Sequence, residues 1–271
     1  MKKKLTVVIV GHLIDDFIFY LKYLIHSLPE ILKECEFIIH YDNSDNYNET
    51  KSSNDIKNLL DSKDISYKLS FGFGGLISSI KNCLIKIETD YYLFLEHDWV
   101  FLEKDNIDFP NVIKVFDKYN FVNSVWFSKD DNQQRGFEIC QDSQNNITPF
   151  TLETRINELN LITTCRWSNN PVIFRTKKMK EWFDNFINNE HVDKINQRQG
   201  NVEEKMIMVY RDQISKNKWE DIRDDWGTYL YGNLFEGPYV GHTDASKRYQ
   251  GSSKSQPEIN GENYIKKFQN V

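Results

Sequence analysis

Two carboxylates, Glu96 and Asp98, follow an apolar run in the segment YYLFLEHDW at residues 91–99. Side chains along a strand alternate between its two faces, so both acids are expected on one side and His97 on the other. Paired carboxylates are ligands for a hard divalent cation, Mg²⁺ or Mn²⁺, which also binds phosphate oxygens. The pair therefore indicates metal-assisted phosphate chemistry, with a simple solvated strand end as the alternative.

Strand and helix patterns alternate in front of these acids. Short apolar runs rich in β-branched or aromatic residues predict strands, and apolar residues at three-and-four spacing predict helices. The predicted strands are Leu5–Gly11, Glu36–Asp42, Ile65–Ser70 and Tyr91–Glu96. The predicted helices are Phe17–Leu28, a weak one at Asn48–Ser62, and Leu76–Glu88, which follows the glycine loop 72–75.

This alternation predicts right-handed crossovers and a mostly parallel sheet that helices cover on both faces. Ligands bind such sheets beyond the carboxyl ends of the strands. Four acids stand at ends of that kind and are expected to converge on one crevice: Asp42, Asp45, Glu96 and Asp98.

The second half of the chain is less regular. Its strand-like segments are Phe121–Ser128 and Pro171–Arg175, with a polar loop over Asp130–Asn146. A helix is expected to bury Met179, Trp182, Phe183 and Phe186. Because no internal repeat and no Pro/Gly/Ser linker separates the halves, we expect a single domain over residues 1–271, with halves at 1–102 and 103–271.

Charge and composition exclude several classes of protein. The 271 residues carry a formal net charge of −6, so the basic field of a nucleic-acid binder is absent. The four cysteines form no CxxC pair, and therefore predict neither a zinc site nor a redox motif. No apolar run approaches the roughly 18–20 residues of a membrane span, and the short N-terminal run precedes acids without a cleavage site. We expect a cytoplasmic protein.

Three segments in order carry a resemblance to a known family: LTVVIVG (5–11), DNSD (42–45) and FGFGGLISSIKNCLIKIETDYYLFLEHD (71–98). They resemble the GT-A glycosyltransferases, in particular the large inverting family with many bacterial polysaccharide enzymes. The resemblance covers residues 5–102 well and the rest thinly. It implies an α/β GT-A fold, in which a Rossmann-like, mostly parallel sheet flanked by helices is fused to a mixed acceptor-binding half.

The resemblance also implies site residues. Glu96-His97-Asp98 stands where the family has its DxD metal motif, with Glu first, so Asp98 is expected to bind Mn²⁺ or Mg²⁺ and a late histidine, His242, to complete the site. The implied contacts to the nucleotide sugar are Gly11, Asp42, Ser44, Asp45, Lys81, Asn82, Glu96 and His97, with Lys247 and Arg248 on the diphosphate. Turn chemistry at Asp42, a solvated Lys81 and a structural His242 are the alternatives.

The family places an acidic pair at the start of a helix beneath the acceptor, and one acid removes the proton of the acceptor hydroxyl. Glu203 and Glu204 match that pair, and Glu204 holds the position usual for the base. Acids in a first helical turn also suit the helix dipole, which is the structural alternative. Trp126, Trp167 and Trp226 are expected either to stack on sugars or to lie in the core.

The resemblance therefore implies inverting transfer of a sugar from a UDP-, GDP- or dTDP-sugar to a hydroxyl acceptor, such as a glycan. Two other functions stay open. A sugar nucleotidyltransferase would have a glycine-rich basic loop after its first strand, whereas this chain has the acidic GHLIDD at residues 11–16. A binding module that kept the fold and lost the chemistry is compatible with Glu96 in place of Asp.

Overall fold

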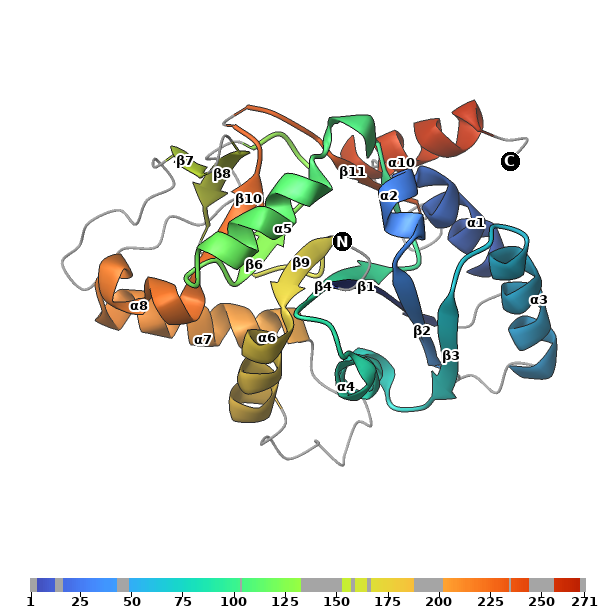
Figure 1. Cartoon of the computed structure of the whole chain (residues 1–271), viewed down its shortest axis with the longest axis horizontal. Helices are drawn as coiled ribbons and strands as arrows, with labels where there is room; N and C mark the ends of the chain where they lie inside the picture. Colours follow the sequence, from blue (N-terminus) through green and yellow to red (C-terminus); the bar gives the residue numbers. More distant parts are fainter. Residues whose placement is uncertain are drawn as a thin grey trace, which may run out of the picture.

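A mixed sheet of nine strands, in the order β3-β2-β1-β4-β9-β6-β10-β8-β7, runs through the described part of the chain. The computed structural model describes residues 4–12, 17–42, 49–102, 104–132, 153–156, 159–164, 167–187, 202–233, 235–243 and 256–268. Figure 1 shows the helices on both sides of this sheet.

The four strands at one end of the sheet are parallel: β1 (Leu5–His12), β2 (Glu36–Asp42), β3 (Tyr67–Gly72) and β4 (Tyr91–Glu96). β1 lies between β2 and β4, and its residues 7–10 are at most 1% exposed. A strand that is buried on both faces has a continuous apolar sequence, and for this reason the strands of this half can be predicted from the sequence. The predicted strands are confirmed, with β3 starting two residues later than expected.

The other half of the sheet is mixed. β9 (Val172–Arg175) lies antiparallel between β4 and β6 (Ser124–Trp126), and β10 (Thr228–Tyr231) is parallel to β6. β8 (Leu159–Thr163) and β7 (Glu153–Ile156) continue antiparallel at the edge. The predicted strand at 121–128 shrinks to the three residues of β6, and most of the predicted polar loop 130–146 lies outside the described residues.

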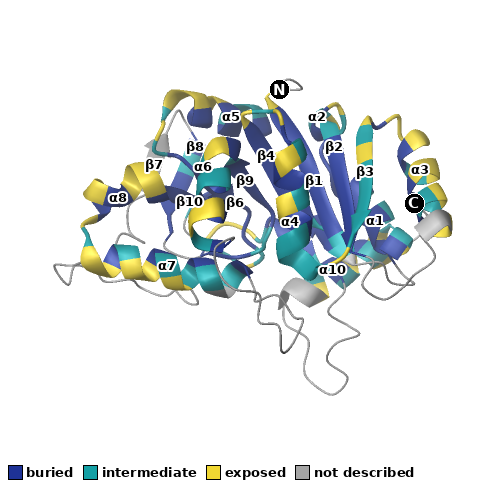
Figure 2. Cartoon of the chain, turned by 90° about the horizontal axis from the view of Figure 1, so that it is seen from below, coloured by how far each residue is buried: buried dark blue, intermediate teal, exposed yellow. Residues whose placement is uncertain are grey.

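Two helical layers cover the sheet. One face packs against α1 (Phe17–Ser27), α2 (Glu30–Lys33), α3 (Glu49–Asp61) and α5 (Phe109–Lys118), with a short 3₁₀ turn at Lys104–Asn106. The other face packs against α4 (Gly75–Lys86), α6 (Thr176–Trp182), the π-helical turn Phe183–Ile187, α7 (Val202–Lys216) and α8 (Trp219–Trp226). Figure 2 shows the buried strands β1, β2 and β4 between helices whose outer faces are exposed, whereas the edge strand β3 is mostly of intermediate burial.

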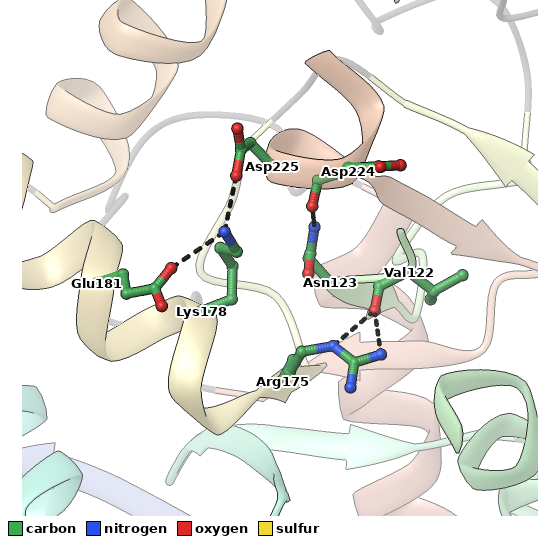
Figure 3. Close-up of polar contacts among 7 residues, drawn as sticks. All are labelled: Val122, Asn123, Arg175, Lys178, Glu181, Asp224 and Asp225. Carbon is green, nitrogen blue, oxygen red and sulfur yellow. Dashed lines mark hydrogen bonds and ion pairs between the residues drawn. The ribbon is translucent and has the colours of Figure 1, made fainter. Parts of the chain in front are cut away.

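Arg175 ties the mixed half together. Its guanidinium donates hydrogen bonds to the carbonyl oxygens of Phe116 (2.8 Å) and Tyr119 (3.2 Å), where α5 ends, and to Val122 O. A cation at this place satisfies carbonyls that a helix C-terminus leaves without partners. Figure 3 shows the hydrogen bonds from Arg175 to Val122 O beside the ion pairs from Lys178 on α6 to Glu181 and to Asp225 on α8.

A second, two-stranded sheet stands beside the main one. β5 (Trp99–Phe101) pairs antiparallel with β11 (Val240–His242), so that Trp99 lies opposite His242. The last helix, α10 (Gln256–Lys267), packs on β11 (Figure 1). Its Tyr264 packs with Val100 of β5 and Tyr23 of α1. Within the described residues, no helix has the length and apolar character needed to cross a bilayer.

Candidate active site

His97 follows β4 and turns toward α1. Its backbone N–H donates to Val10 O at 3.1 Å, and its ring stacks on Phe17 with centroids 5.2 Å apart. A Cβ on Gly11 would lie only 2.6 Å from His97 Nδ1, so Gly11 makes room for this ring. The alternation that the sequence predicted therefore holds for His97. The ring is 5% exposed and packs on the α1 side of the sheet, and the expected contact of His97 with the substrate stays a prediction.

Asp98 and His242 lie in contact. His242 Nε2 is 3.0 Å from Asp98 Oδ2, because the antiparallel pairing of β5 with β11 brings the two residues together. The backbone N–H and the hydroxyl of Thr243 both donate to Asp98 O at 2.7 Å, which fixes the turn on which the carboxylate stands. The two residues predicted as metal ligands from distant parts of the sequence thus share one site.

The electrostatics of Asp98 favour its ionised form. Burial alone would raise the pKa of this carboxyl, but the hydrogen bond with His242 and the nearby charges of His97 and His242 outweigh it and lower the pKa to about 2. The residue is 3% exposed, and its second oxygen, Oδ1, is buried without a hydrogen-bond partner among the described residues. A buried carboxylate oxygen in that state calls for a cation or another donor.

These residues fit a divalent metal in part. A carboxylate oxygen and an imidazole nitrogen are both ordinary ligands of Mn²⁺, and Asp98 Oδ1 has no competing partner in the described structure. In that same part of the chain, no group of three or more His, Cys, Asp or Glu side chains is arranged to hold a metal. A cation here would therefore need oxygen ligands from a diphosphate and water besides Asp98 and His242.

Asp42 ends β2 and holds the glycine loop in front of α4. Its Oδ2 accepts a short hydrogen bond from the backbone N–H of Gly75, the first residue of α4, and the residue is 3% exposed. One oxygen of Asp42, the residue expected to approach the nucleotide, thus holds the start of α4. The interaction fixes where α4 begins relative to β2.

A polar cluster beside Asp42 includes a residue that the sequence analysis missed. His40 is 1% exposed, and its Nδ1 lies 2.9 Å from Ser70 Oγ. Burial and the charge of Lys86 lower the pKa of His40 to about 4, against a smaller opposite effect of Asp42. A histidine inside the apolar run EFIIHYD was the available signal for this cluster.

Two predicted donor contacts, Lys81 and Asn82, lie on α4. A Cβ on Gly72, at the end of β3, would lie 2.9 Å from the ring of His40 and 3.4 Å from Asn82 Nδ2, so the Asn82 amide is close to the strand ends. Asn82 is half-buried and Lys81 is exposed. The structure therefore brings the Asn82 amide against the carboxyl edge of the sheet.

The acidic pair does open a helix. α7 begins at Val202, which is buried in the core on the α4 side, and Glu203 is half-buried in the first turn. The side chain of Glu204 lies outside the described structure, as do Ser44, Asp45, Lys247 and Arg248. Glu96, at the end of β4, is half-buried.

The three tryptophans considered for sugar stacking are core residues. Trp126, Trp167 and Trp226 are at most 5% exposed. Trp126 and Trp167 make an edge contact with centroids 5.5 Å apart, and Trp226 stacks on Trp182 at 5.4 Å. The narrow pocket beside Trp126 holds only about 20 Å³, which is room for about one water molecule.

No family model matches the chain, and no curated protein matches it by sequence. Two solved glycosyltransferase structures share its shape. GalNAc-T7 with UDP, GalNAc and Mn²⁺ gives a TM-score of 0.54 at 15% identity, over 97% of this chain and 47% of that one. TarS (1–349) from S. aureus with UDP-GlcNAc gives 0.52 at 15% identity, over 93% of this chain and 62% of that one. The chain thus spans less than two thirds of either protein.

A cytidylyltransferase from Leptospira borgpetersenii gives a TM-score of 0.47 at 11% identity, over 97% of this chain and 94% of that one, which is too low a likeness to support a conclusion. At such identities a shared shape establishes a fold and not a reaction. The chain has the α/β fold of the GT-A glycosyltransferases, as the sequence resemblance implied.

Proposed function

We propose that the chain is a metal-dependent glycosyltransferase that moves a sugar from a nucleoside diphosphate donor to a hydroxyl acceptor such as a glycan. The observation that carries the proposal is the contact of Asp98 with His242 at the carboxyl end of β4, where the buried Asp98 Oδ1 has no partner among the described residues. In a sheet of this topology ligands bind beyond that edge.

The predicted site residues fall into groups with different tasks in the proposed reaction. Asp98 and His242 would hold Mn²⁺ or Mg²⁺, a cation that supplies charge neutralisation to the leaving diphosphate. Lys247 and Arg248 would bind the same phosphates, and Asn82 and Glu96 would contact the donor. Asp42 would act indirectly, since its carboxylate positions the start of α4. Glu204 would accept the proton of the acceptor hydroxyl as the hydroxyl attacks the sugar carbon.

A base in that position makes the transfer inverting, because the acceptor attacks from the face opposite the leaving group. NMR of a product made from an α-linked donor then gives a β linkage. An α linkage would remove Glu203 and Glu204 from the base role and leave the transferase assignment untouched.

A panel of nucleotide sugars tests the function itself. The full chain is incubated with Mn²⁺ and, in turn, UDP-GlcNAc, UDP-GalNAc, GDP-mannose and a dTDP-sugar, and free nucleoside diphosphate is measured. UDP-sugars come first because TarS was solved with UDP-GlcNAc and GalNAc-T7 with UDP. Slow release from one donor supports transfer. Nucleotide formation that depends on pyrophosphate would instead indicate a nucleotidyltransferase. If no donor releases nucleoside diphosphate, the result would indicate a binding module.

A further inference from the structure

The larger of the two described pockets lies away from Asp98. It has a volume of about 500 Å³ and opens between the start of α5 and the segment that joins β10 to β11. Asp108, the N-cap residue of α5, and Asn111 on α5 line one side, and Asn233, Glu236 and Tyr239 line it from the joining segment. Its size falls within the range of about 300–1,000 Å³ that is usual for small-molecule sites.

The lining predicts the class of ligand. It contains amides, carboxylates and tyrosines, and no Lys, Arg or His lines it among the described residues, so it is unsuited to a phosphate. Burial would raise the pKa of Glu236, but hydrogen bonds from Asn233 and Tyr239 lower it, so this carboxylate accepts hydrogen bonds near neutral pH. Amides donate and accept, and carboxylates accept, which matches the neighbouring hydroxyl groups of a sugar.

An exposed aromatic ring stands in the same segment. Phe235 lies between the lining residues Asn233 and Glu236, and it is 73% exposed. Its φ is +65°, a conformation that non-glycine residues rarely adopt and that a bulky residue keeps only where its surroundings enforce it. The hydrogen bond from Phe235 N–H to Asn132 O at 2.9 Å helps to hold it. An exposed ring beside polar groups is the arrangement that stacks on the apolar face of a sugar.

The pocket and the Asp98 site lie at opposite ends of the β5–β11 sheet. Asp98 and His242 stand at the end where Trp99 pairs with His242. The pocket stands beyond the other end, where Phe101 pairs with Val240 and Tyr239 precedes β11. Tyr231 and Tyr239, which line the pocket, also belong to the core on the α1 and α5 side of the main sheet. A sugar in this pocket would therefore lie apart from the Asp98 and His242 side chains.

We propose that this pocket, between the start of α5 and residues 232–233 and 235–239, binds a neutral sugar residue independently of the donor. If the chain is a glycosyltransferase, the site holds a unit of the glycan remote from the one that reacts. Sugar binding itself does not rest on the proposed transfer.

Saturation-transfer NMR on the full chain tests the site without nucleotide or metal. The probes are glucose, galactose, mannose and N-acetylglucosamine, each at millimolar concentration. We compare the parent with two pocket variants: Asn111→Ala, in the lining, and Phe235→Ala, which lies in the chain between the lining residues Asn233 and Glu236. The control is Phe19→Ala, which removes another exposed ring, 45% exposed on α1 and outside the pocket. Circular dichroism establishes that each variant is folded.

We expect at least one sugar to give a signal with the parent and with Phe19→Ala, and its affinity to fall about tenfold in one or both pocket variants. Addition of UDP and Mn²⁺ should leave that signal in place. Three results would overturn the inference. They are the absence of a signal for all four sugars, an affinity in both pocket variants equal to that of the parent, and displacement of the sugar by UDP and Mn²⁺. None of these results depends on turnover, so donor hydrolysis remains a separate test of the proposed function.

Discussion

Replacement of Asp98 by Asn should separate the metal site from the stability of the fold. The amide has the shape of the carboxylate and can keep a hydrogen bond to His242 Nε2, now 3.0 Å from Asp98 Oδ2. The two hydrogen bonds from Thr243 go to the backbone oxygen of Asp98, so they survive the change. Only the negative charge is lost, and with it the oxygen that suits a hard cation.

The structure sets the size of both effects. A hydrogen bond to a charged group contributes about 1.5–3 kcal/mol and a neutral one about 0.5–1.5, so Asp98→Asn should lower the free energy of unfolding by only about 1 kcal/mol. For a chain of this length that lowers Tm by about 2–4 °C. Changes beside a metal ligand already weaken binding by about 10–100-fold, so the loss of a ligand should weaken Mn²⁺-dependent donor binding at least about 100-fold.

Calorimetric titration of the nucleotide sugar selected by the donor panel, with and without Mn²⁺, measures this difference. Asp117→Asn is the matched control, because Asp117 also accepts from a side-chain partner, Lys4 Nζ at 2.8 Å, but lies on α5 and is partly exposed. It should leave binding unchanged. A folded Asp98→Asn variant that binds donor in Mn²⁺ like the parent would show that the carboxylate only closes the turn after β4.

Four further outcomes are expected. His242→Ala should raise the Mn²⁺ concentration for half-maximal activity several-fold without removing activity, and a titration curve that overlays the parent's makes His242 structural. Glu204→Gln should lower turnover about 100-fold with donor affinity near normal, whereas Glu203→Gln should do much less; full turnover in Glu204→Gln would leave the base unidentified. Gly261→Ala should destabilise the chain and raise the Mn²⁺ requirement, because its Cβ would lie 2.2 Å from His242 O; an unchanged melt and Mn²⁺ titration contradict this. The pKa of His40 is near 6.5 in the unfolded chain and about 4 in the folded chain, so the free energy of unfolding should fall by up to about 3 kcal/mol as the pH drops from 6.5 to 4. Urea denaturation at several pH values measures this dependence, and His40→Gln should reduce it in that pH range. The same pH dependence in the variant and the parent would refute the assignment.

The parallel half of the fold was predictable because its signals are local. Residues 7–10 of β1 are buried on both faces, and such a strand must be a continuous apolar run whatever it packs against. β6 was harder to delimit. Its three paired residues lie in a longer apolar stretch, 121–128, where Val122 and Phe127 are buried without being part of the strand. Burial alone does not tell a strand from a packed connection.

The sequence indicated which residues belong to the candidate site better than it indicated what each residue contacts. The sequence places His97 and Asp98 side by side, but only packing decides that the histidine ring lies against Phe17. Asp42 shows the same limit, since a carboxylate at a strand exit suits a ribose and a helix start equally well, and the bond to Gly75 depends on where α4 begins. The role of each residue depends on contacts with residues that are distant in the sequence, and the spacing of residues along the chain does not reveal these contacts.

The contact of Asp98 with His242 could not be predicted from local sequence, because it depends on β11 and α10, which lie near the end of the chain. β5 is only three residues long and gains its partner, β11, from near the end of the chain. β11 is in turn held by α10, where Gly261 approaches so closely that a Cβ would overlap the backbone of His242. Short strands are weak on their own, and their geometry is fixed by what packs on them. The position of His242 relative to Asp98 is therefore set by the docking of α10, and the candidate metal site is assembled only when the first and last parts of the chain have packed together.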